Sequence, residues 1–302
     1  NQMTHSVEIL ETLLEKYPRD ILALRIAHYL HFYVGTDADM KASVSRAFDI
    51  WQPGDPYYGF ILGMYSFGCE EAGDYATAET CGRQAVEINR DDIWAAHSVA
   101  HVLQMQSRFR EGISWCGDLL PGWTDANNFV NHLHWHKALQ HIGAGEPEAA
   151  LNIYDTWLEK PIADDFYLDV CNAAALLWRL EMLGLDVGNR WEAQREISAR
   201  RACDDDLVFP TMHYLMAPIA LGDEVAVDAA LASLQHWASE NTTQGEICQQ
   251  VGLPLAEAMI EVRSGNRTEG ATRIAAIADD IWKIGGSHAQ RDLFSLIQNY
   301  YH

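Results

Sequence analysis

Apolar residues recur along this chain at the three- and four-residue spacing of amphipathic helices, while the alternation of apolar and polar residues typical of strands is poor. Alanine, leucine and glutamate, which favour helices, are abundant throughout. In the segment 73–92 (GDYATAETCGRQAVEINRDD), Ala78 and Ala85 stand seven residues apart on one face of the expected helix. Small residues at such positions let two antiparallel helices approach closely. The pattern therefore predicts an all-α protein.

A residue with turn character recurs between paired apolar segments, at Gly35, Gly73, Ser107, Gly145, Gly184, Gly222 and Gly265. The successive spacings are 38, 34, 38, 39, 38 and 43 residues, a loosened form of the roughly 34-residue period of tetratricopeptide (TPR) repeats. We therefore expect residues 1–302 to form one right-handed α-solenoid of antiparallel helix pairs, a TPR-like superhelix. The least regular stretch, 238–250, predicts a longer loop inside this array.

The ends of the chain have little of the polar character that the capping units of a solenoid need. The sequence begins in a helical pattern and without an initiator methionine. We therefore expect it to be a fragment that lacks flanking helices at both ends.

The composition limits the classes of partner. A formal net charge of −22 argues against nucleic acid and anionic membrane surfaces, since both need a basic footprint. No apolar run approaches the roughly 18 residues that a membrane helix requires. The six cysteines include no CxxC pair, which favours reduced thiols and a cytoplasmic location. A small molecule or a peptide in a concave groove suits this acidic array better, and a homo-oligomer stays open.

Five of the 13 histidines fall within 40 residues, on two segments with a helical pattern. In a TPR unit the first helix of each pair lines the concave surface. Counted from the turn residues, the pairs His97/His101 and His132/His136 share one stripe of successive inner helices. His28 and His213 also fall on inner helices. Four imidazoles are therefore expected to converge on one point of the groove.

The i,i+4 spacing is also the spacing with which zinc-binding helices place two nitrogens on one metal. His97, His101, His132 and His136 are accordingly candidate ligands for zinc or another divalent metal, although the sequence requires no cofactor. The motif HSVAH has no glutamate between its histidines, which excludes the common metalloprotease arrangement. An acid–base site would use His97, His101 or His136 with a carboxylate, for which the candidates are Asp92, Asp125 and Asp169.

Two other interpretations compete with the metal site. The histidines could be interior residues that bond carbonyl groups and pack against Trp94, Trp135 and Trp178. They could instead form a polar pocket for a ligand, because ligand clefts are apolar with a few convergent polar groups. The residues expected to contact such a ligand are His28, His97, His101, His132, Trp135, His136, Asp169, Arg179, His213 and Arg291.

Several stretches of the chain, among them WAAHSVAHVLQM, NHLHWHKALQHIGAGEPEAALNIYD and GGSHAQRD, resemble the tetratricopeptide repeat protein 38 family. The resembling stretches span nearly the whole chain in the same order. The resemblance implies a TPR-like α-solenoid and names no substrate or reaction. It implies histidines shared with the family at His28, His97, His101, His132, His136 and His213, and polar residues at Asp169, Arg179, Gln290, Arg291 and Asp292.

The sequence therefore supports two functions. The first is a TPR-type binding protein that holds a small molecule or a peptide in a histidine- and aromatic-lined concave pocket. The second is a hydrolase-like enzyme that uses the clustered histidines as metal ligands or as a general acid and base, with Asp169 orienting one of them.

Overall fold

A computed structural model describes residues 2–123 and 126–301 of the protein. These residues form helices and connecting turns, with no β-strand among them, so the predicted all-α class is confirmed. The chain forms two compact units, residues 2–144 and the residues from Gly145 onward, here called the N-terminal and C-terminal units. Each unit is described by itself below.

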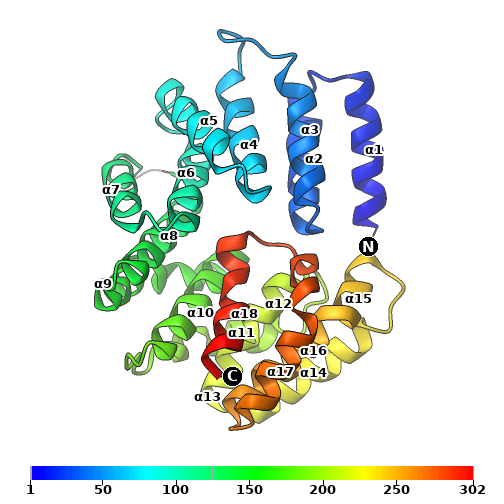
Figure 1. Ribbon diagram of the computed structural model, residues 1–302. Coiled ribbons are helices and arrows are strands. Elements are labelled where there is room, and N and C mark those ends of the chain that lie inside the picture. The colour runs from blue at the N-terminus through cyan, green and yellow to red at the C-terminus, as the bar shows by residue number, and fades with distance from the viewer. Residues whose placement is uncertain (1, 124–125, 302) are drawn as a thin grey trace. The chain divides into compact units, whose positions relative to one another are not determined.

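The N-terminal unit is built from eight α-helices and one short 3₁₀ turn among its described residues (Figure 1). In chain order they are α1 (Met3–Lys16), α2 (Ile21–Tyr33), α3 (Asp37–Phe48), α4 (Tyr58–Glu71), α5 (Tyr75–Ile88), α6 (Ile93–Met105), α7 (Phe109–Leu119), η1 (Leu120–Gly122) and α8 (Phe129–Gly143).

The C-terminal unit has helices of 5 to 16 residues, several of which are separated by 3₁₀ and π turns. They are α9 (Pro147–Ile153), η2 (Tyr154–Leu158), η3 (Lys160–Asp164), α10 (Tyr167–Met182), η4 (Arg190–Gln194), α11 (Arg195–Arg201), α12 (Val208–Tyr214), α13 (Met216–Leu221), α14 (Glu224–Trp237), α15 (Thr243–Ile247), η5 (Cys248–Gly252), α16 (Leu253–Arg263), α17 (Arg267–Ile277), η6 (Ala278–Ile284) and α18 (His288–Tyr301).

The seven turn residues predicted from the sequence all adopt left-handed backbone conformations, with φ between +57° at Ser107 and +100° at Gly265. Glycine reaches this region without a steric penalty, which is why it dominates these positions. An α-helix precedes each of the seven turns, and another follows six of them directly. The exception is Gly184, after which the next α-helix begins only at Arg195. The predicted succession of helix, turn and helix is therefore present at six of the seven turns.

Aspartates begin several of these helices. The side chains of Asp20, Asp74, Asp92 and Asp223 each accept a hydrogen bond from the backbone N–H three residues later, at the starts of α2, α5, α6 and α14. Such N-caps satisfy backbone donors that the helix itself leaves open. Part of the chain's acidity therefore has a local structural role.

Small residues bring α7 close to α8 within the N-terminal unit. A Cβ atom at Gly112 would lie 2.3 Å from the side chain of Gln140, and one at Gly143 would lie 2.4 Å from the ring of Phe109. The buried amide of Gln140 in turn donates to the carbonyl of Ala100 on α6, at 3.0 Å. These contacts fix the spacing between α6 and α8, the two helices that carry the clustered histidines.

The expected long loop over residues 238–250 is wrong in part. Thr242 caps a short helix, α15, through a bond from the N–H of Gly245, and the π turn η5 continues into α16. The expectation that all helix pairs stack into one right-handed superhelix stays a prediction. No helix among the described residues has the length and apolar character needed to cross a membrane.

Candidate functional site

Four histidine side chains from α6 and α8 meet inside the N-terminal unit. The Nε2 atom of His97 lies 2.7 Å from Nε2 of His101 and 3.0 Å from Nε2 of His132. The Nε2 atoms of His132 and His136 are 3.1 Å apart. One ring nitrogen from each residue lies within 4.8 Å of the other three. The expected convergence of the two i,i+4 pairs is therefore observed, and we call these residues the four-histidine cluster.

The cluster is buried inside an aromatic shell. Its four residues are between 0% and 4% exposed. The ring centroids of Phe67 and Phe129 lie 5.6 and 5.0 Å from that of His97. The indole of Trp135 stacks on the ring of His132 at 5.2 Å. Such a shell lowers the local dielectric, so an uncompensated charge at the cluster is costly.

Hydrogen-bond acceptors lie next to the outer nitrogens of two rings. The Nδ1 atom of His101 is 3.3 Å from Oε2 of Glu70 and 3.6 Å from Oε1 of Glu71. The Nδ1 atom of His136 donates to Oε1 of Gln104 at 3.3 Å. Because these neighbours are oxygens that accept, we assign the ring proton to Nδ1 in both residues. Their Nε2 lone pairs then point into the cluster.

Two buried carboxyl groups lie next to the cluster. Glu70 is fully buried, and Glu71 is 3% exposed. Burial lowers the pKa of His97 well below its ordinary value, with smaller effects from two neighbouring imidazoles and Arg25. His97 is therefore neutral and does not offset the carboxylates. The geometry brings together four ring nitrogens and two buried carboxyl groups, which are the kinds of ligand and neighbour that a metal cation has in proteins.

Two predicted ligand contacts lie near the cluster without belonging to it. Trp135 forms part of the aromatic shell. His28 is buried, and the centroid of Phe67 lies 5.8 Å from the His28 ring and 5.6 Å from the His101 ring. Desolvation lowers the pKa of His28 to about 3, so its ring is neutral.

The other predicted contacts belong to the C-terminal unit. Arg179 donates to the carbonyl of Ala289 at 3.2 Å and forms an ion pair with Asp292, which ties α10 to α18. Arg291 donates to the carbonyl of Gly286 at the start of α18. These contacts give both arginines a structural role within their own unit. The residues of this group, each 6% exposed or less, are Asp169, Arg179, His213 and Arg291.

His213 yields a pH prediction. Burial lowers its pKa to about 4, and its Nδ1 donates to the carbonyl of Phe209 at 2.8 Å. The unfolded chain takes up this proton below about pH 6.5, whereas the folded protein does so only near pH 4. The stability that His213 contributes is therefore complete above pH 6.5 and is lost as the pH falls through this window.

Between pH 6.5 and pH 4 the free energy of unfolding of the C-terminal unit falls, and we expect His213→Gln to make this fall smaller by about 3 kcal/mol. Urea unfolding of wild type and variant at several pH values across the window measures this difference. The matched control is His5→Gln, since the His5 side chain is 67% exposed. Equal acid sensitivity in the wild type and the His213 variant would contradict the assignment.

The sequence analysis missed the polar neighbours of the cluster. Of its candidate carboxylates, Asp92 caps α6 by accepting from the N–H of Ala95 at 3.0 Å. Asp125 lies outside the described residues. The carboxylates at the cluster are instead Glu70 and Glu71. A signal was present, because two adjacent acids close the otherwise apolar segment 58–71 just before a predicted turn.

No protein-family model matches this chain, and no solved structure matches it. The resemblance to the tetratricopeptide repeat protein 38 family therefore stays a prediction. The fold and the site nevertheless define a class: an all-α protein of consecutive helix pairs with a buried four-histidine cluster.

Proposed function

We propose that the four-histidine cluster binds one divalent transition-metal ion, with zinc as the expected metal, and that this ion holds α6 and α8 together. The observation that carries the proposal is the approach of the four Nε2 atoms to one another. Imidazole nitrogen is a good ligand for zinc, and closed four-ligand sites are typical of structural zinc.

The distances between the nitrogens fit a shared metal. Four Zn–N bonds of about 2.0–2.1 Å in a tetrahedron separate neighbouring nitrogens by about 3.3 Å, and bonds at right angles separate them by about 2.9 Å. The three Nε2–Nε2 contacts measure 2.7, 3.0 and 3.1 Å. The other three nitrogen pairs lie within 4.8 Å, so the rings need to close by up to about 1.5 Å to coordinate one ion.

Neutral imidazole rings do not satisfy all three of these contacts with their own protons. With Nδ1 protonated on His101 and His136, the Nε2 atoms of both residues accept. His97 and His132 can each donate one Nε2–H to them, but two N–H groups then face each other across the 3.0 Å contact between His97 and His132. Removing either proton leaves two lone pairs in opposition at another contact. A metal ion accepts all four lone pairs at once and offsets the charge of Glu70 and Glu71.

The surroundings favour a holding role over hydrolysis. A catalytic zinc keeps a coordination position open for water or substrate, whereas the four ligand residues here are at most 4% exposed. The carboxylate next to His101 Nδ1 is the kind of partner that orients a metal-bound histidine. We therefore propose that the metal stabilises the packing of the inner helices.

Elemental analysis of the purified protein tests this function. We expect about one metal ion per chain in the wild type. Two double variants, His97→Ala with His101→Ala and His132→Ala with His136→Ala, are each expected to retain less than about a tenth of that content. Metal content is measured by mass spectrometry of zinc, iron, copper and nickel after dialysis.

The matched control is His141→Gln, which replaces a half-buried histidine on α8 outside the cluster and is expected to keep the metal. A wild-type protein that holds no metal even after incubation with each of the four ions would exclude the proposal. Full metal content in both double variants would exclude this cluster as its location.

A further inference from the structure

A cavity of about 300 Å³ in the N-terminal unit is lined by Trp94, whose ring lies 6.3 Å from that of His97 in the four-histidine cluster. Its walls come from three first helices of successive pairs: Arg25 and Tyr29 on α2, Phe60 and Met64 on α4, and Trp94 on α6. The volume is at the lower end of the range for small-molecule sites. Trp94 is 37% exposed, so the cavity is reached from solvent.

The guanidinium of Arg25 is held in this cavity by aromatic rings. Its central carbon lies 4.3 Å from the ring centre of Tyr29 and 4.4 Å from that of Trp94. Its Nη2 donates to the Tyr29 hydroxyl at 2.7 Å. The rings of Tyr29 and Trp94 are inclined at 78° to each other, and the guanidinium N–H groups other than the one that donates to Tyr29 can bind a ligand. The arginine is therefore fixed before any ligand arrives.

Arg25 also differs from several arginines of this unit in forming no ion pair with a described residue. Arg46, Arg83 and Arg108 each form an ion pair with a glutamate. Across the part of the chain that the structure describes, no carboxylate lies within ion-pair distance of Arg25. Asp92 lines the same cavity and interacts electrostatically with Arg25 without forming an ion pair with it. The remaining N–H groups of Arg25 are available to an anion.

The rest of the cavity indicates which anion. Asp92 also lines it, but this residue is 4% exposed and its carboxyl accepts the N–H of Ala95 as the cap of α6. Arg25 is the single cation among the described lining residues. One cation beside an acid in a protein of net charge −22 suits a monoanion better than a phosphate dianion.

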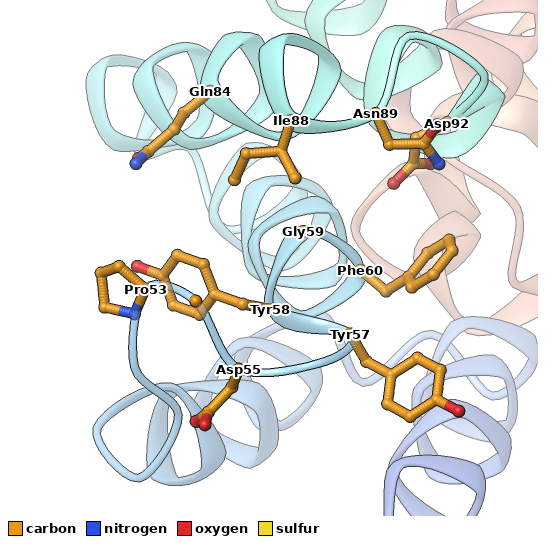
Figure 2. Close-up of a pocket in the computed structure, with 11 residues that line it drawn as sticks. Pro53, Asp55, Tyr57, Tyr58, Gly59, Phe60, Gln84, Ile88, Asn89 and Asp92 are labelled. Carbon is orange, nitrogen blue, oxygen red and sulfur yellow. The ribbon is translucent and has the colours of Figure 1, made fainter.

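The walls beyond Arg25 are apolar and continue past Phe60. Phe60 and Asp92 are shared with a second cavity of about 420 Å³ (Figure 2). Figure 2 shows Tyr57, Tyr58 and Phe60 on one side of that space and Ile88 on α5 facing them. An apolar body attached to the anion can therefore pack against Met64 and Phe60 while its charged end meets Arg25.

We propose that this cavity is a binding site for a small carboxylic acid with an aromatic or aliphatic body. The carboxylate binds the in-plane N–H groups of Arg25, and the body packs between Phe60, Met64 and Trp94. This site is separate from the metal ligands, since Arg25 and the residues around it are not members of the four-histidine cluster. Its occupation does not require the metal.

Titration calorimetry with phenylacetate as the probe tests the proposal. We expect saturable binding to the wild type, and binding weaker by about tenfold or more in Arg25→Gln, because a charge-assisted hydrogen bond is lost. Arg25→Lys keeps the charge without the planar fork and is expected to lie between the two. Phenylacetamide, which lacks the negative charge, is expected to bind the wild type about tenfold more weakly than phenylacetate.

The matched control is Arg19→Gln. Arg19 also lies over an aromatic ring, 4.3 Å from that of Trp51, but it is paired with Asp55, so its loss is expected to leave phenylacetate affinity unchanged. Circular dichroism checks that each variant is folded. Absence of phenylacetate binding to the wild type, or equal affinity in a folded Arg25→Gln, overturns the proposal. Inorganic phosphate that binds as tightly as phenylacetate overturns its assignment to carboxylic acids.

Discussion

Chelation of the bound metal is expected to lower the free energy of unfolding of the N-terminal unit by about 4 kcal/mol, if the metal is present at about a thousand times its dissociation constant. The reason is linkage, since an ion that binds the folded cluster and not the unfolded chain adds its binding free energy to stability. Denaturant unfolding with and without a chelator measures the total change. Hydrogen exchange at peptides from α6 and α8 shows where protection is lost.

The variant His97→Ala with His101→Ala provides the control, because it has no complete cluster to lose. Its unfolding curve is expected to be the same with and without the chelator. Peptides from the C-terminal unit, which contributes no ligand to the cluster, serve as an internal reference for exchange. Identical unfolding and exchange of the wild type under the two conditions would count against a structural metal.

The helices of this protein were predictable because the signals that produce them are local. Helical periodicity and the seven turn residues each act over a few positions, and all seven turn residues have positive φ. The prediction was wrong after Gly184. The sequence pattern predicts that a second helix begins directly after this turn, but the next α-helix begins only at Arg195. There Asp186 accepts from the N–H of Gly188, whose own φ is +58°, and this second turn delays the next helix.

The candidate site was predictable on each helix but not between helices. Three- and four-residue spacing places His97 beside His101 and His132 beside His136 on a shared face. It does not show which side chains of a neighbouring helix lie at the same level. Glu70 is 31 residues before His101, and only the packing of α4 against α6 brings its carboxylate within 3.3 Å. Tertiary contacts of this kind have no local signature.

The surroundings of Arg25 could not be predicted from the sequence either. An arginine in an acidic chain is expected to pair with a carboxylate, as most arginines of this unit do. Its position between Tyr29 and Trp94 depends on the approach of α2 to α6 through α4. That Arg25 forms no ion pair with the residues the structure describes is therefore visible only after the helices are packed.

Replacing His101 by leucine in metal-depleted protein is expected to cost about 3 kcal/mol or more of unfolding free energy, because the buried carboxyl group of Glu70 loses the Nδ1–H donor that lies 3.3 Å from it. The matched control is His136→Leu, at the equivalent position of the second pair. It removes a ring that is also fully buried but bonds to the neutral amide of Gln104, so a smaller cost of about 1–3 kcal/mol is expected.

A double-mutant cycle separates the loss of the carboxylate's partner from the loss of packing. If burial of the Glu70 charge is the cause, adding Glu70→Gln to the His101→Leu variant restores most of the lost stability, since a neutral amide is less costly to bury than a carboxylate. The same Glu70→Gln change in the His136→Leu background has no such effect, because His101 is still present there. Equal costs for the two leucine variants, without recovery by Glu70→Gln, would show that Glu70 does not depend on His101.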